Sequence, residues 1–306
     1  TKTAYRKTTM LTRKLGLGCT EAQYFMGMAF DAGDGVPKNM ALSLAWYRKA
    51  AAKNHPSALY DLALHYLEEK TNRASMELAD KYMLRAARAG HREAQFQCAM
   101  TCFRGNTMPQ DCEAGKNWLA KSAAEGWAKA EFTLYEMYFN GRLPAQGCSR
   151  YPQDRPEAVR WLRRAVEHDH LQAQTILAIM LIRGKDIPPD QTEAERLLRH
   201  AAGHGNSEAQ NDLGYAILSG ATAKRDLVEA AMWCKLAQNH AFDSNILMHA
   251  QVNYTNVTSH LSLKQQMEAE QWVRAFQAQS KSQADPRANG WEHNPEYECE
   301  DGQLGR

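Results

Sequence analysis

Apolar and small residues recur along most of the chain with the period of an α-helix. Six alanines begin the same pattern: Ala22, Ala58, Ala94, Ala130, Ala173 and Ala209. Each is followed four, five and eight residues later by side chains that are mostly apolar or small, and these offsets lie on one face of a helix. Successive alanines are 36 residues apart, except for one interval of 43. This regularity predicts a repeated structure.

A second helix is predicted in every repeat. Five copies carry a glycine eleven residues after the alanine (Gly33, Gly105, Gly141, Gly184 and Gly220), and glycine commonly ends helices in the left-handed conformation. A large side chain then precedes a pair of small residues by one turn, which suits a helix pressed against its neighbour. These large side chains are Trp46, Tyr82, Trp118, Trp161, Leu197 and Trp233. Each repeat is therefore predicted to be a helix–turn–helix hairpin that buries its apolar face by stacking.

The predicted fold is all-α: a right-handed superhelical solenoid of about six helix–turn–helix repeats with terminal capping helices. The repeats are assigned to residues 22–57, 58–93, 94–129, 130–172, 173–208 and 209–245. Residues 1–21 are expected to form an N-terminal cap or a half-repeat. Residues 246–279 form a C-terminal capping region whose helix, from His260 to Gln279, carries Leu263, Met267, Trp272 and Phe276 along one side. Residues 280–306 form an acidic tail that either stays flexible or docks.

The first repeat carries the most specific motif of the chain. It combines Ala22, Met26-Gly27, Phe30, Gly33, Gly35-Val36, Trp46 and Lys49-Ala50-Ala51. With these residues it resembles the Sel1-like repeat, a relative of the tetratricopeptide repeat, and the resemblance extends over roughly residues 22–245. The second copy departs most, because Glu69 stands where the other copies have the turn glycine. The resemblance implies an α-solenoid adaptor that binds other proteins.

Charge and cysteine content exclude several classes of protein. A net charge of +2 provides no field for nucleic acid and no basic face for a membrane surface, and no apolar run is long enough to span a bilayer. Seven cysteines argue against a fully paired set of disulfides. Cys98 and Cys102 fall on core positions, where we expect small buried hydrophobes.

The compartment follows from the resemblance. Some exported members of the resembled family close each hairpin with a disulfide between its second helix and the next first helix. Those positions hold no cysteine pair here, which favours a cytoplasmic compartment. A periplasmic or secreted location is the alternative if a leader peptide has been removed.

Eleven histidines invite a search for a catalytic or metal site. Four of them, His55, His91, His170 and His240, occupy one position of the repeat, where we expect a partly protonated imidazole to favour the C-terminal end of a helix. His200 and His204 have metal-ligand spacing, but no acidic third ligand is fixed beside them. The chain has neither a phosphate-binding glycine loop nor a G-x-S-x-G turn. We therefore predict no catalytic residue, no metal and no cofactor.

The best functional signal is a row of side chains on the first helices, two, six and nine residues after each alanine. In related helical-hairpin solenoids the first helices line the concave side, and this row is unusually aromatic and rich in methionine for a surface facing water. The candidate partner-binding residues are Tyr24, Met28, Tyr60, Leu64, Phe96, Met100, Phe132, Glu136, Ile179 and Tyr215, with Tyr151 from the longer turn of the fourth repeat. An apolar groove of this kind could hold a helix or an extended segment. The alternatives are core packing for the row and a tolerated surface loop for Tyr151.

These observations predict a non-enzymatic scaffold or adaptor that binds a partner polypeptide in its concave groove. The partner would be a peptide, a helix or a globular enzyme, with no nucleic acid and no membrane span, and the chain would be a monomer or bound to that partner. One alternative is an immunity-type inhibitor that wraps a bacterial toxin enzyme. Another is an enzyme that binds or hydrolyses β-lactams, against which the missing cysteine pairs and nucleophile motif argue.

Overall fold

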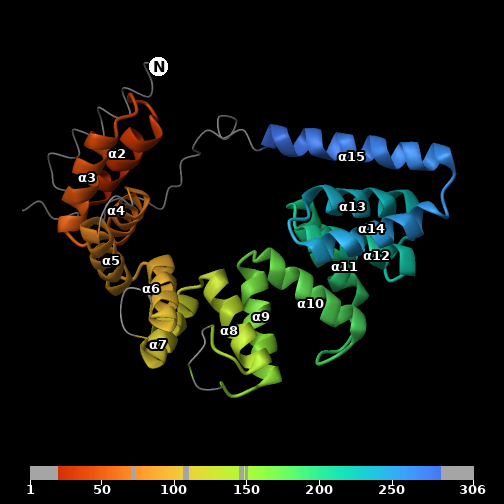
Figure 1. Ribbon diagram of the computed structural model, residues 1–306, viewed down its shortest axis with the longest axis horizontal. Helices are drawn as coiled ribbons and strands as arrows, with labels where there is room; N and C mark the ends of the chain where they lie inside the picture. The colour runs from red at the N-terminus through yellow and green to blue at the C-terminus, as the bar shows by residue number, and fades with distance from the viewer. Residues whose placement is uncertain (1–19, 70–72, 106–109, 145–147, 149–150, 284–306) are drawn as a thin grey trace, which may run out of the picture. The chain divides into compact units, whose positions relative to one another are not determined.

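The computed structural model describes residues 20–69, 73–105, 110–144, 148 and 151–283, all of whose regular structure is helical (Figure 1). These residues form two compact units, one of residues 20–130 with 142–151 and one of residues 131–141 with 152–283. The all-α prediction is confirmed. The expectations for residues 1–19, for the second-repeat turn at 70–72 and for the tail from 284 lie outside the described residues.

Helices follow one another in pairs, as the repeat predicts. The N-terminal unit contains α2 (Thr20–Ala32), α3 (Met40–Ala52), α4 (Pro56–Glu69), α5 (Arg73–Arg88), α6 (Arg92–Arg104) and α7 (Cys112–Ala124), and α8 (Ala128–Asn140) leads into the C-terminal unit. The C-terminal unit continues with α9 (Arg155–Glu167), α10 (Leu171–Arg183), α11 (Gln191–Gly203), α12 (Ser207–Ser219), α13 (Leu227–His240), α14 (Ser244–Thr258) and α15 (Leu263–Gln283). Within each hairpin the two helices pack together, for example α4 on α5 and α12 on α13.

The predicted glycine turns are confirmed, because all five turn glycines have φ between 60° and 79°. The second helix then begins at a side chain that caps its free backbone N–H groups. Asn39, Asp111, Asp154, Asp190 and Asp226 each accept such a hydrogen bond at the start of α3, α7, α9, α11 and α13. Short acidic or amide side chains suit this position because their oxygen reaches the N–H two or three residues on.

The marker alanines form the centre of the core. Ala58, Ala94, Ala130, Ala173 and Ala209 are all fully buried. On the second helices, however, the deepest side chain is the one after the predicted ring: Tyr47, Met83, Leu119, Leu162, Leu198 and Cys234 are all buried. Trp46, Trp118 and Trp161 are only half-buried, and cations three residues later, such as Lys49 at 3.9 Å from the Trp46 ring centroid, lie over their faces. At the same position Leu197 and Trp233 are buried, so the burial of this large side chain differs from copy to copy.

The two helices of a hairpin come closest where the first helix has a small residue, five positions after the marker alanine. A Cβ atom added to Gly214 on α12 would lie 2.5 Å from the Sγ of Cys234 and 3.1 Å from the carbonyl oxygen of Ala230, both on α13. A Cβ atom on Gly27 would similarly lie 2.3 Å from the ring of Tyr47. Five of the six copies have glycine or alanine at this position, where a larger side chain would separate the helices; the fourth copy has Tyr135.

One pair of cysteines was not foreseen from the sequence. Cys112, at the start of α7, forms a disulfide with Cys148 in the longer turn of the fourth repeat, 36 residues away. The inference of a reducing compartment from missing cysteine pairs therefore loses its basis. Cys98 and Cys102 are free and buried, as predicted.

The end of the described chain differs from the prediction in two ways. Residues 246–279 contain α14 as well as the expected α15, so the repeated alternation of helices continues beyond residue 245. The buried side of α15 carries Ala269 and Val273, with Phe276 against the ring of Trp233 at 5.4 Å. Leu263 and Met267 face away and are 74% and 60% exposed. Within the described helices, none has the length and apolar character needed to cross a membrane.

Replacing Gly214 with alanine tests the close approach of the two helices. Alanine favours helices by about 1 kcal/mol over glycine, yet we expect Gly214→Ala to lower the free energy of unfolding by about 1–3 kcal/mol because its Cβ overpacks against α13. The matched control is Gly203→Ala, whose Cβ would meet nothing within 4 Å; it should not destabilise the protein. Urea unfolding followed by circular dichroism measures both, and a stabilised Gly214→Ala would contradict the packing.

The disulfide gives a second test of the fold. Closing a loop of this length stabilises a protein by about 3–4 kcal/mol in the chain-entropy model. The double variant Cys112→Ser/Cys148→Ser should lose stability of this order under oxidising conditions, and the wild type should lose the same amount when a thiol reductant is added. If the reductant changes the wild type and the double variant alike, the effect does not come from this bond.

Candidate functional site

The candidate residues divide into a packed set and an exposed set. On the first-helix face, defined by positions two, six and nine after each marker alanine, the ring at position two is packed: Tyr60 is 8% exposed, and Tyr24, Phe96 and Phe132 are half-buried. Position six is more open, with Leu64 38% and Tyr215 56% exposed. Glu136 is exposed as well, whereas Met28, Met100, Ile179 and the loop residue Tyr151 are half-buried.

The packed rings stack on the histidines that precede the next first helix. Tyr24 stacks on His55 with ring centroids 4.6 Å apart, Tyr60 on His91 at 4.3 Å, and Phe132 on His170 at 4.5 Å. These rings therefore hold consecutive first helices in register. For this position the core-packing alternative describes the structure better than a free aromatic anchor does.

The same histidines cap the first helices, which corrects the prediction for them. The Nδ1 atoms of His55, His91 and His170 accept hydrogen bonds from the backbone N–H three residues later, at 3.2, 3.3 and 3.2 Å. Each lies at the N-terminal end of the next helix, where a protonated Nδ1 would have no lone pair to accept with. Only His240 lies at the end of a second helix, as expected, with its Nδ1 3.1 Å from Oε1 of Gln210.

Asn206 shows that the cap, and not the imidazole, is the common feature. It occupies the histidine position before α12, and its Oδ1 accepts a hydrogen bond from the N–H of Ala209 at 2.8 Å. Sequence reasoning missed this role because it assigned the position to the preceding helix. The recurrence of histidine and asparagine, two acceptors able to cap a helix, was the signal that could have found it.

Carboxylates lie beside the packed rings. The hydroxyl of Tyr24 hydrogen-bonds to Asp61, and that of Tyr60 to Glu93. Burial is the main cause that raises the pKa of Asp61 to about 6, and the charge of Asp31 adds to it. Asp212, at the same register position on α12, has its pKa raised to about 6 mainly by burial. Both positions were absent from the sequence-based candidates, because nothing in the sequence distinguishes a half-buried aspartate from a solvated one.

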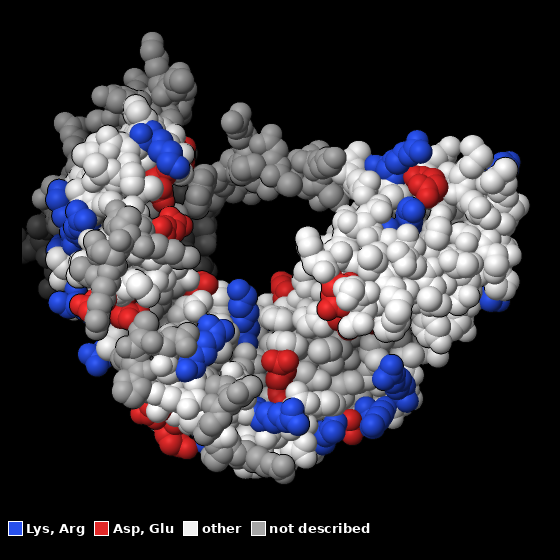
Figure 2. All heavy atoms as spheres, in the orientation of Figure 1, with Lys and Arg blue, Asp and Glu red and all other residues white. Residues whose placement is uncertain are grey.

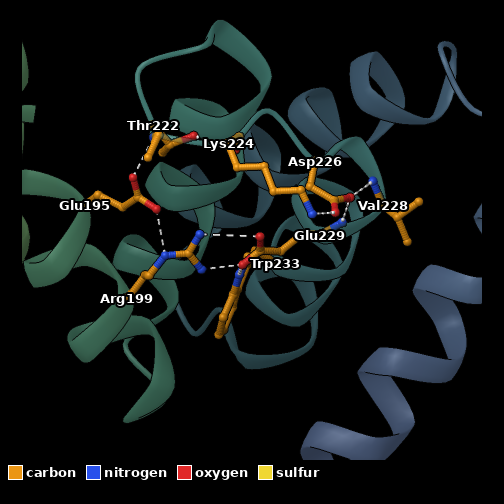
Figure 3. A network of polar contacts seen from close by, with 9 residues as sticks. Glu195, Arg199, Thr222, Lys224, Asp226, Val228, Glu229 and Trp233 are labelled. Carbon is orange, nitrogen blue, oxygen red and sulfur yellow. Dashed lines mark hydrogen bonds and ion pairs between the residues drawn. The ribbon is translucent and has the colours of Figure 1, made fainter. Parts of the chain in front are cut away.

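On the second helices the polar contacts link repeats to one another. Arg199 on α11 contacts Glu195 on the same helix and Glu229 on α13, whose Oε1 also accepts a hydrogen bond from the indole of Trp233 at 3.1 Å (Figure 3). One repeat earlier, Arg163 pairs with Glu193 at 3.2 Å in the same register. These contacts join neighbouring second helices and show no feature of a reaction site. Among the described residues no group of three or more histidines, cysteines, aspartates or glutamates could hold a metal ion.

Comparison with known proteins identifies the repeat. A sequence model of the Sel1 repeat matches residues 20–55, 56–91, 92–127, 136–170, 171–206 and 207–237. Five of the six matches begin two residues before a marker alanine, and the fourth begins six residues after Ala130. No curated protein matches the sequence.

Solved structures share the fold. The chain is similar to a protective antigen present in uropathogenic Escherichia coli strains that displays an SLR fold, with a TM-score of 0.70 and 21% identity; 95% of this chain and 61% of the antigen are covered. It is also similar to a Sel1 repeat protein from Oxalobacter formigenes, with a TM-score of 0.63, 28% identity and coverage of 79% and 68%. The chain thus spans less than two thirds of the antigen. An immunity protein from Pseudomonas aeruginosa is more distant, with a TM-score of 0.43 and 18% identity, too low to support an argument.

The histidine caps predict a pH dependence of stability. Burial lowers the pKa of His91 below its ordinary value, so in the folded state this group holds its proton less tightly than in the unfolded chain. Its contribution is complete above about pH 7 and is lost as the pH falls through the ordinary histidine range toward the lower folded value. We expect His91→Asn, which keeps a capping oxygen, to lose less stability between about pH 7 and pH 5 than the wild type.

The control for this prediction is His91→Ala, which removes the cap and should cost about 1 kcal/mol already at neutral pH. Chemical unfolding at both pH values gives the three free energies. The interpretation fails if His91→Asn loses as much stability on acidification as the wild type does.

Proposed function

The chain belongs to the Sel1 repeat family, whose members are generally protein-interaction scaffolds, and we propose that it binds a partner polypeptide along its first-helix face. The proposal concerns binding without catalysis. Each unit presents its own part of this face: α2, α4 and α6 in the N-terminal unit, and α8, α10 and α12 in the C-terminal unit.

The supporting observation is the exposure of large apolar side chains on a face that is otherwise fixed. Leu64 and Leu67 on α4 are 38% and 37% exposed, and Tyr215 on α12 is 56% exposed. The neighbouring rings at position two are held by their histidines, so a partner would meet a surface that is already ordered. An ordered surface loses less conformational entropy on binding, and exposed apolar and aromatic groups are typical anchors of protein interfaces.

Inhibition of a bacterial toxin enzyme and turnover of a β-lactam stay predictions from the sequence. The contacts on the first-helix face do not separate the first from other protein binding. On this face the phenol of Tyr24 is hydrogen-bonded to Asp61 and that of Tyr60 to Glu93, and we propose no reaction for these groups.

Substitution of the exposed leucines tests the proposal. Leu64→Gln/Leu67→Gln keeps the side-chain size but removes apolar contact, and it should lower the amount of partner recovered by cross-linking and affinity purification roughly tenfold or more, as expected for the loss of two interface anchors. The control is Met76→Gln/Leu78→Gln on α5, the second helix of the same repeat, where the two side chains are 47% and 40% exposed.

Both double variants alter exposed side chains, so their unfolding free energies should stay within about 1 kcal/mol of the wild type. Partner recovery must then fall for the α4 variant and not for the α5 variant. Equal recovery with the α4 variant, or a loss confined to the α5 variant, would place the interface on another surface.

A further inference from the structure

The first helices of repeats one and two, α2 and α4, carry several acidic side chains. α2 and α4 contain no lysine or arginine, but they include Glu21, Asp31, Asp61 and Glu68. Glu93 follows at the start of α6. Figure 2 shows acidic side chains grouped along one edge of this unit. On α2 and α4 the apolar positions of the first-helix face therefore lie on helices with a net negative charge, whereas α6 also carries Arg92 and Arg104.

Asp61 lies at the centre of these charges. Its carboxylate accepts the hydrogen bond of Tyr24 and interacts electrostatically with Asp31 and Glu93. The imidazole of His55 also acts on it electrostatically, and its Nε2 lies 2.7 Å from Oε2 of Glu21. None of the ion pairs between described side chains involves Asp61. Among the described residues, the site thus holds a half-buried carboxylate that is not paired with a lysine or arginine, and such a carboxylate gains free energy when a cation approaches.

The apolar side chains next to Asp61 belong to the same helix. Leu64 follows Asp61 by three residues, so these two side chains are neighbours on the surface of α4, and Leu67 follows Leu64 by the same spacing, farther from Asp61. The aromatic rings of Tyr24 and Tyr60 border the carboxylates. Arginine and lysine side chains pair with carboxylates and also pack favourably on aromatic faces.

We infer that the first-helix face of the N-terminal unit binds a basic amphipathic segment of a partner protein, with an arginine or lysine against Asp61 and apolar side chains against Leu64 and Leu67. The inference rests on the proposed function and adds the chemical class of the partner. The single sign of charge on α2 and α4 favours a cationic occupant over a neutral or acidic one.

A second copy of the chain is a poorer occupant than a separate partner. Its most arginine-rich helix, α9, already pairs each arginine within the C-terminal unit: Arg155 with Asp186, Arg160 with Glu157, Arg163 with Glu193 and Arg164 with Glu131. If these arginines bound another molecule, the carboxylates that they pair with now would be left unpaired. One of them, Glu131, has no exposed side-chain surface.

The inference can be tested with a designed probe. Fluorescence anisotropy would measure how the wild type binds a fluorescein-labelled peptide in which arginine and leucine alternate with alanine, and the same peptide with glutamate in place of arginine. We expect binding of the arginine peptide only. Asp61→Asn keeps the acceptor for Tyr24 and removes the charge, and it should weaken binding roughly tenfold or more.

The matched control is Glu125→Gln, which removes one negative charge from an exposed side chain beyond the end of α7 and should leave the affinity within about twofold. Asp61→Asn should also abolish the loss of affinity that the wild type shows as the pH falls through about 6. If both acidic-to-amide variants weaken binding equally, the peptide responds only to net charge and the inference is overturned.

Other outcomes separate the inference from the proposed function. If Leu64→Gln/Leu67→Gln abolishes peptide binding but Asp61→Asn does not, or if the glutamate peptide binds equally well, the face binds polypeptides but the assignment of a cationic partner is wrong. If the arginine peptide binds and neither variant weakens it, the peptide binds elsewhere and both statements fail for this unit. If light scattering shows that the wild type forms a dimer and Asp61→Asn does not, the occupant of this face is a second copy of the chain and not a separate partner.

Discussion

The close approach of helices at small residues is the constraint on which the rest of the structure depends. The marker alanines are fully buried, and a single added carbon at Gly214 would overlap the neighbouring helix. Helices at this separation bury each other's backbone and leave their longer side chains to fill the space between repeats. A hairpin of about 36 residues could not exclude water from this face alone, so each repeat is stable only against its neighbours.

The stacked histidines fix the position of each first helix relative to the one before it. His55, His91 and His170 each make two kinds of contact: the ring packs on an aromatic side chain of the preceding first helix, and Nδ1 caps the first helix that follows. A first helix is thereby fixed in both position and starting point. On the second helices, Arg163 and Arg199 connect successive repeats through glutamates in the same register. These two sets of contacts do not include position six of the first helices, which is the more exposed position of the face.

The first-helix face is a candidate for binding because some of its positions pack against other repeats and others stay exposed. Tyr60 and Leu64 are both apolar residues of the same row on the same helix, yet Tyr60 is buried by its histidine and Leu64 is exposed. A surface made in this way is rigid, because the rings beneath it are already packed. On α2 and α4 it is also negatively charged, since neither helix contains a lysine or arginine and Asp61 forms no ion pair with another side chain that the structure describes. The exposed apolar side chains and the negative charge together favour a basic amphipathic partner, which the repeat pattern alone does not indicate.

The sequence by itself determined the helices, their ends and the repeat, because these depend on residues close together in the chain. The alanine interval, the turn glycines and the Asp or Asn caps are local features, and all were found in the structure at the described positions. The interior of each hairpin was also predictable at the marker alanines, since a helix buries the side that its small and apolar residues share. The resemblance to the Sel1-like repeat followed from the same local features.

Only the tertiary structure decided what covers each side chain. Helical periodicity gives the direction of a side chain from its own helix, but not the neighbour that it meets. For this reason the sequence placed Tyr60 and Leu64 in one class, assigned the histidines to the wrong helix, and treated Trp118 and not Leu119 as the buried residue. The bond between Cys112 and Cys148 was hidden for the same reason, because it depends on where a long turn lies against the repeat before it. The half-buried position of Asp61 between Tyr24, Asp31 and Glu93 is likewise a property of the surroundings that three helices create.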